Sequence, residues 1–264
     1  MELWLIFIIA GLVAGFLAGL LGIGGGFVVV PVLIFVLPHS GIPFEYVPHF
    51  AIGTSLLCIC ITSLASTRAH HIKKSVDWNL FKLITPGLII GTLMGATMAS
   101  VLNGKVLIVI FVTGALSTAI YLLSGHQPKA HNGHSKWPLF AYANFTGAIS
   151  SLIGIGGGSV LVPFLVYKGK SMVQSVATAA ACGFPIALFG ALGYAISGQQ
   201  QVLEIDYSLG YLYLPAFLGI VLFSTIAAPF GAKLAHFVSE KSLKQIFAVF
   251  LFLTSAQILY SQWS

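Results

Sequence analysis

Charged side chains are scarce in this chain of 264 residues, because Asp, Glu, Lys and Arg together make up only 7% of it. A soluble globular domain carries roughly 25% charged residues, so the scarcity excludes a soluble domain of any size. Apolar residues take the place of the charge: 58% of the chain is hydrophobic and its mean hydropathy is +0.99. We therefore expect the chain in a lipid bilayer, where its length supplies about eight to ten helices of ~20 residues.

Acidic residues are scarcer than basic ones, and all six of them lie in loops or at the ends of apolar segments. No carboxylate is therefore placed inside the membrane to relay a proton or to hold sodium. A negative cell interior drives a monovalent anion outward with about 2.3 kcal/mol per 100 mV. The sequence thus favours export of an anion without a coupling ion, whereas uptake would need a coupling ion that the sequence does not reveal.

Motifs for catalysis, metal binding and nucleic-acid binding are also missing. Cys58, Cys60 and Cys182 lie in apolar segments, and the Cys58–Cys60 spacing fits no zinc site. The sequence has no His-Glu-x-x-His, no pair of membrane aspartates and no nucleophile elbow. Its basic residues never cluster beyond two adjacent positions. We expect no enzymatic activity, no cofactor, no metal and no nucleic-acid partner.

Glycine is abundant, with 29 residues, and it gathers in a repeated stretch. Leu21-Gly22-Ile23-Gly24-Gly25-Gly26 returns 132 residues later as Ile153-Gly154-Ile155-Gly156-Gly157-Gly158, and Pro31 and Pro163 have the same spacing. Two landmarks with one spacing indicate a duplicated unit. Each glycine costs a helix about 1 kcal/mol relative to alanine, so the stretch predicts a helix break. Glycine breaks at matching positions in two halves are typical of a transporter's binding site.

The distribution of Lys and Arg predicts how the chain crosses the membrane. Apolar segments run over 3–37, 49–69, 79–102, 105–123, 138–168, 175–197, 207–236 and 242–260, with the first and the fifth broken at the glycines. If each broken segment enters and returns as two helices, eleven of the twelve Lys and Arg residues share one side and only Lys105 lies on the other. A single crossing would divide them six and six. The positive-inside rule selects the hairpins.

This topology predicts a multi-pass protein of the cell membrane, the inner membrane in a cell that has two. Both termini lie outside, the linker is cytoplasmic, and the N-terminal run is the first membrane helix, because it lacks the basic start of a cleaved signal peptide. The chain divides into a first membrane repeat (1–123), the cytoplasmic linker (124–137) and a second membrane repeat (138–264). Each repeat then has five crossings, so the second enters from the opposite face.

The predicted fold is an all-α polytopic membrane protein with two inverted-topology repeats, each a glycine-broken helical hairpin followed by three transmembrane helices. Inverted repeats place a binding site near the middle of the bilayer, between two halves that rock to open either side. The expected mechanism is alternating access.

An anion in this site needs hydrogen-bond donors. The helix starts after the glycines, Gly24–Phe27 and Gly156–Ser159, offer free N–H groups and positive dipole ends, unless small residues there serve only close packing. Hydroxyl and amide side chains of similar depth, Thr146 among them, are further candidates, unless they bond back to their own helices. Arg68 suits an oxyanion, although a cytoplasmic boundary anchor is the favoured interpretation. The predicted substrate-binding set is Gly24, Gly25, Gly26, Thr54, Ser55, Arg68, Asn144, Gly156, Gly157, Gly158, Ser159 and Thr178.

At these stretches the sequence resembles the sulfite exporter TauE/SafE family of membrane permeases over essentially its full length. The resemblance is carried by GLVAGFLAGLLGIGGGFVVVPVL (11–33), AIGTSL (51–56), GAISSLIGIGGGSVLVPFLV (147–166) and TAAACGFPIALFGALGY (178–194). It implies a transporter of small sulfur-containing oxyanions such as sulfite, sulfoacetate or related organosulfonates. The second half has Ala180-Ala181 where the first has Gly53-Thr54, which leaves open whether both halves contact substrate equally.

The expected function is therefore a secondary transporter of small sulfur oxyanions that works in the export direction. Two alternatives stay open: an importer of thiosulfate or another organic anion, and a membrane scaffold that transports nothing. The expected partners are the anion and the lipid bilayer, and a homodimer is left open.

Overall fold

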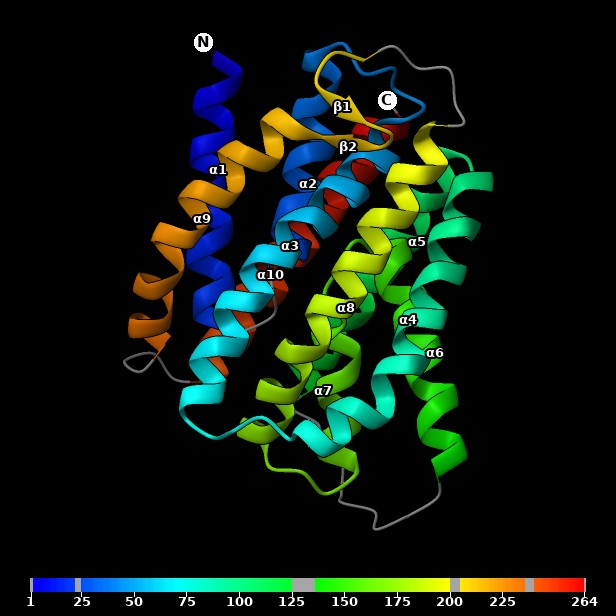
Figure 1. The fold of residues 1–264 in the computed structure, drawn as a ribbon. Helices are drawn as coiled ribbons and strands as arrows, with labels where there is room; N and C mark the ends of the chain where they lie inside the picture. The colour runs from blue at the N-terminus through cyan, green and yellow to red at the C-terminus, as the bar shows by residue number, and fades with distance from the viewer. Residues whose placement is uncertain (1, 22–24, 125–135, 200–204, 236–239, 264) are drawn as a thin grey trace.

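The computed structural model describes residues 2–21, 25–124, 136–199, 205–235 and 240–263. These residues form a bundle of long helices with both ends of the chain on the same side of the molecule (Figure 1). The elements are α1 (Glu2–Leu21), α2 (Gly26–Val36), the 3-10 helix η1 (Leu37–Ser40), α3 (Val47–Ile72), α4 (Trp78–Val101), α5 (Gly104–Ser124), α6 (Lys136–Ile153), α7 (Gly158–Tyr167), α8 (Met172–Gln199), the strands β1 (Ser208–Leu209) and β2 (Leu212–Tyr213), α9 (Leu214–Ala235) and α10 (Glu240–Trp263).

The bundle has the dimensions and the surface of a membrane protein. Four helices, α3, α4, α5 and most of α8, are long and apolar enough to cross a bilayer. Large apolar side chains cover the outside of the bundle: Val101 is 81% exposed, Leu253 66% and Leu222 60%. Because a water-facing surface of this kind is rare, these side chains face lipid.

Both broken segments end one helix and start another at the repeated glycines. In the second copy α6 ends at Ile153 and α7 begins at Gly158. In the first copy α1 ends at Leu21 and α2 begins at Gly26, while Gly22 and Gly24 lie outside the described residues. The residues that precede α2 and α7, Gly25 and Gly157, share a left-handed backbone with φ of 76°. That conformation is strained for a residue with a Cβ, which explains the glycines.

Helix pairs join the two halves of the chain. α1 runs along α9, and α6 runs along α4; both members of each pair start at the same end of the bundle (Figure 1). Gly15 of α1 packs on the backbone of Ser224, and its counterpart 132 residues on, Gly147 of α6, packs on the backbone of Leu88 and Thr92. Small residues permit this close approach of two helices. α3 packs against α8 and α5 against α10 in the middle.

The apolar segment predicted over 207–236 is helical only from Leu214 onward, which corrects the sequence interpretation. Residues 208–213 form a short antiparallel hairpin of β1 and β2, so the fold is not purely helical. Tyr207 and Gly210 have positive φ values of 59° and 55°, which no helix continues through. Gly210 also lies against the backbone of Ala195 in α8, where a Cβ would collide with the carbonyl oxygen. The hairpin therefore closes over the end of α8.

Candidate functional site

The two glycine breaks meet inside the bundle. Gly26, the first residue of α2, lies against the carbonyl oxygen of Gly154 and the Cα of Ile155, so closely that a Cβ on Gly26 would collide with them. The hydroxyl of Ser55 on α3 donates to the same Gly154 carbonyl at 2.9 Å, and both residues are buried. The tips of the two broken segments, 132 residues apart in the sequence, are thus in direct contact.

Ile59 of α3 and Gly183 of α8 hold this contact from the side. A Cβ on Gly26 would lie 3.1 Å from Cδ1 of Ile59, and one on Gly156 would lie 3.1 Å from Cγ2 of the same side chain. The Gly156 position is also 3.6 Å from the Cα of Gly183. Because α3 and α8 pack against each other, they form the frame on which both breaks rest.

Each short helix begins at this contact with amide groups that donate to no hydrogen-bond acceptor among the described residues. The carbonyl of Gly157 accepts from Val160 N at 3.2 Å and from Leu161 N at 2.8 Å, which leaves the amides of Gly158 and Ser159 without a helical partner. The Gly25 carbonyl likewise accepts from the third and fourth residues of its helix, Val28 and Val29. Neither helix has a side-chain cap or an acidic residue in its first turn. Two positive dipole ends therefore remain uncompensated.

Three residues with unpaired buried hydroxyls lie at the start of α7. Thr146 and Ser150, one turn apart on α6, are fully buried, and neither hydroxyl has a hydrogen bond. A Cβ on Gly157 would lie 3.3 Å from Oγ of Ser150 and 3.6 Å from Cγ2 of Thr146. The Ser159 oxygen is also buried and unpaired, although the residue as a whole is half-buried. An unpaired buried hydroxyl costs about 1–3 kcal/mol, so three of them at one helix start favour this place as a binding site.

The predicted site residues divide into two groups. Gly25, Gly26, Gly156, Gly157, Gly158, Ser55 and Ser159 belong to the contact between the breaks, and Gly24 lies outside the described residues. The other four lie elsewhere. The hydroxyl of Thr54 accepts from the amide of Tyr213 at 3.0 Å. Asn144 packs with its backbone against Gly91 of α4, and Arg68 is exposed near the end of α3.

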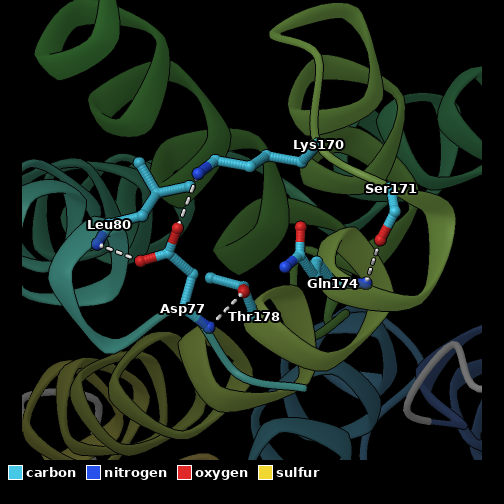
Figure 2. A network of polar contacts seen from close by, with 6 residues as sticks. All are labelled: Asp77, Leu80, Lys170, Ser171, Gln174 and Thr178. Carbon is cyan, nitrogen blue, oxygen red and sulfur yellow. Dashed lines mark hydrogen bonds and ion pairs between the residues drawn. The ribbon is translucent and has the colours of Figure 1, made fainter. Parts of the chain in front are cut away.

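Thr178 lies at the end of the bundle where α4 and α6 begin, in a polar network with Asp77 (Figures 1 and 2). Its hydroxyl accepts from the Asp77 amide at 3.0 Å. The Asp77 carboxylate accepts from Leu80 N at 3.0 Å, which caps α4, and from the Lys170 ammonium at 2.7 Å. The hydrogen bond from Lys170 lowers the pKa of Asp77 below its ordinary value, and the Leu80 amide adds to this effect.

Ser150 is the site residue that the sequence interpretation missed. Its signal was present, because it follows Thr146 by four residues and so lies on the same face of a helix. Among the described residues no group of three His, Cys, Asp or Glu side chains is placed to hold a metal ion. What the site offers is a set of neutral donors, hydroxyls and backbone amides, and such a set binds an anion.

The fold and the site together define a polytopic helical membrane protein with paired broken helices. The family profile described as "Sulfite exporter TauE/SafE" matches residues 7–258. The chain belongs to this family, which confirms the resemblance.

Relatives over nearly the whole length are named as transporters. The chain is 33% identical over 249 residues to a "Probable membrane transporter protein" of Haemophilus influenzae, with 94% of each chain covered. It is 29% identical to a protein of the same description from Methanocaldococcus jannaschii, which covers 90% of this chain and 88% of the relative. The "Probable membrane transporter protein YunE" of Bacillus subtilis is also 29% identical, with 97% of each chain covered. No solved structure gives a significant match to the chain.

Proposed function

We propose that this protein is a secondary transporter that exports a small sulfur-containing oxyanion, such as sulfite or an organosulfonate, by alternating access between two inverted repeats. The observation that carries the proposal is the contact of Gly26 with Gly154, because it brings two uncompensated helix starts to one place inside the bundle. Helix starts attract anions. The family description supplies the class of substrate.

The arrangement of the helices supports the inverted repeats. The most extensive helix pairings have counterparts if α1 to α5 are exchanged with α6 to α10. α1 with α9 becomes α6 with α4, while α3 with α8 and α5 with α10 map onto themselves. The first repeat starts at the end of the bundle where both termini lie, and α6 starts at the other end (Figure 1). Two halves related in this way exchange roles when a site opens to one side and then to the other.

Charge supports the orientation and the direction. The end of α3, the start of α4 and the end of α7 carry Arg68, Lys73, Lys74, Lys82, Lys168 and Lys170, whereas Lys105 lies at the end of the bundle with the termini (Figure 1). The positive-inside rule then places the lysine-rich end in the cytoplasm and both termini outside. An anion held by neutral donors leaves such a cell down the membrane potential without a coupling ion.

Flux measurements on the purified protein in liposomes test this function. Sulfite, thiosulfate, sulfoacetate and taurine are loaded in turn, and potentials of both signs are imposed. We expect saturable flux of at least one sulfur oxyanion that accelerates when its compartment is made negative, without a proton or sodium gradient. Gly41→Cys reports the orientation of each molecule, because Gly41 is exposed and the native cysteines are buried.

Three results would contradict the proposal. Flux no faster than in liposomes without protein would show that the protein does not transport these anions. Flux that requires an inward proton or sodium gradient would show that the protein is a coupled importer and not an exporter. Labelling of Gly41→Cys from the cytoplasmic face of cells would show that the protein has the opposite orientation to the one proposed.

A further inference from the structure

We infer that the two repeats contribute unequally to binding, and that the anion is held in one site at the start of α7 by the hydroxyls of Thr146, Ser150 and Ser159 together with the amides of Gly158 and Ser159. This inference rests on the proposed function and deepens it. It assigns a binding site to the second repeat alone and predicts one anion for each chain.

The first step is the lack of a hydrogen-bond partner for the three hydroxyls. Serine and threonine in membrane helices usually donate to a carbonyl of the preceding turn, and in this chain Thr62, Thr85 and Ser117 do so. Thr146 and Ser150 do not, although both are fully buried in a helix. Other buried hydroxyls without a partner, such as those of Thr92 and Ser255, are not at a helix start. Ser175 in the first turn of α8 is a further hydroxyl of this kind, but the Ser171 side chain caps that helix by accepting from the Gln174 amide. Around Gly157 three such hydroxyls lie at a helix start without a side-chain cap.

The second step is the sequence of the first repeat at the same places. The residues 132 positions earlier than Thr146, Ser150 and Ser159 are Ala14, Ala18 and Phe27. Phe27 is buried and packs edge-on against Phe111 and Phe247, with ring centroids 6.1 Å and 6.2 Å away. The start of α2 is therefore occupied by an aromatic cluster and offers no hydroxyl to a ligand.

The third step is the charge of the ligand. The helices around the site are α3, α4, α6, α7 and α8. Their only lysine or arginine residues are Lys82 near the start of α4, Lys136 at the first position of α6 and Arg68 near the end of α3. Neutral donors alone compensate one negative charge far better than two. Three hydroxyls match the three oxygens of a pyramidal or tetrahedral SO3 group. The site thus selects a singly charged sulfite or sulfonate over the sulfate dianion.

Binding measurements on the full-length protein in detergent test the site, with sulfite and methanesulfonate as probes and titration calorimetry as the readout. We expect one anion bound for each chain, and affinity for sulfate at least about ten-fold weaker. Ser150→Ala and Thr146→Val each remove one hydrogen bond to a charged ligand, so each raises Kd by about ten-fold or more.

Two control variants match the site variants, one by its place on α6 and the other by its unpaired buried hydroxyl. Ser151→Ala removes a neighbouring hydroxyl that donates to Ala148 O at 3.0 Å, and Thr92→Val removes an unpaired buried hydroxyl outside the site. Both are expected to bind within about two-fold of the parent protein. Thermal unfolding without anion separates binding from folding: Ser150→Ala is at least as stable as the parent, because it loses an unpaired hydroxyl, while its stabilisation by methanesulfonate disappears.

Parent-like binding by Ser150→Ala and Thr146→Val, in a protein that still transports, would overturn this site and leave the proposed function intact. Two anions bound for each chain, or sulfate bound as well as methanesulfonate, would overturn it as well. A parent protein that neither binds nor moves any of these anions would instead overturn the proposed function itself.

Discussion

The two ends of the bundle use the same backbone contact with different surroundings. At one end, the hydroxyl of Thr54 on α3 accepts a 3.0 Å hydrogen bond from the amide of Tyr213, the residue before α9. At the other end, the hydroxyl of Thr178 on α8 accepts a hydrogen bond, also of 3.0 Å, from the amide of Asp77, the residue before α4. The two contacts have the same form, although the aligned stretches of the sequence place Ala181, not Thr178, opposite Thr54. Each of these long helices, α3 and α8, holds the start of a helix from the other half of the chain.

The surroundings of the two contacts have diverged. Around Tyr213 they are aromatic and buried: the neighbouring Tyr211 stacks on His49 with ring centroids 4.9 Å apart, and burial raises the pKa of Tyr211 to about 12. Around Asp77 they are charged and partly exposed, with the ion pair to Lys170 (Figure 2). The two contacts therefore share a backbone geometry while the side chains around them differ, as they do at the two glycine breaks.

The largest expected effect comes from breaking the contact between the repeats. Gly26→Ala places a Cβ against the backbone of Gly154 and Ile155, which cannot move aside as a side chain can. Alanine is intrinsically the better helix former by about 1 kcal/mol, yet overpacking here is expected to lower the free energy of unfolding by about 3 kcal/mol and to abolish flux. Thermal unfolding and liposome flux measure both effects.

Gly41→Ala is the matched control for Gly26→Ala. Gly41 has a left-handed φ of 80° and nothing within 4 Å of its Cβ position, so alanine there pays only the backbone strain of about 1–2 kcal/mol. We expect normal flux from this variant. Parent-like stability of Gly26→Ala would show that the two tips do not need their close contact.

These contacts mark where sequence interpretation succeeds and where it ends. Local patterns set most of the helices: the segment predicted over 79–102 is α4, Trp78–Val101, and the glycine breaks were visible as a repeat. The partners of Thr54 and Thr178 were not, because the acceptor and donor of each contact are separated by 159 and 101 residues. Both threonines were predicted at the substrate, since a hydroxyl in an apolar segment does not reveal which backbone it meets.

A smaller effect is expected from removing the two threonine hydroxyls. Thr54→Val leaves the buried amide of Tyr213 without an acceptor, and we expect the free energy of unfolding to fall by about 1–3 kcal/mol. Thr178→Val is expected to cost less, about 1 kcal/mol, because the partly exposed surroundings of Asp77 allow water to replace the hydroxyl. Thermal unfolding of both variants measures which of them loses more stability. Equal losses of stability would mean that the exposure of the two contacts does not affect the cost of removing the hydroxyl.

The smallest effect concerns the charge that only one end carries. Because the pKa of Asp77 is lowered in the folded protein, its carboxylate stabilises the fold fully above the unfolded value of about 3.9, and this contribution is lost as the pH falls through the folded pKa. Asp77→Asn keeps an N-cap acceptor for α4 and loses the charge. The pair is partly exposed, with 38% of the Lys170 side chain and 22% of the Asp77 side chain accessible, so we expect a difference below about 1 kcal/mol at pH 7.

Unfolding temperatures of the parent and of Asp77→Asn, measured from pH 7 down to pH 3, test this difference. The two proteins should converge as the pH falls, and high salt at pH 7 should narrow the gap, because it screens an exposed pair. Lys170→Met is the control that removes the partner instead: it should match Asp77→Asn at pH 7 but retain a carboxylate that titrates nearer its ordinary pKa. A gap that stays constant with pH and salt would mean that Asp77 acts at this end only as a cap for α4, and the two ends would then differ in packing rather than in charge.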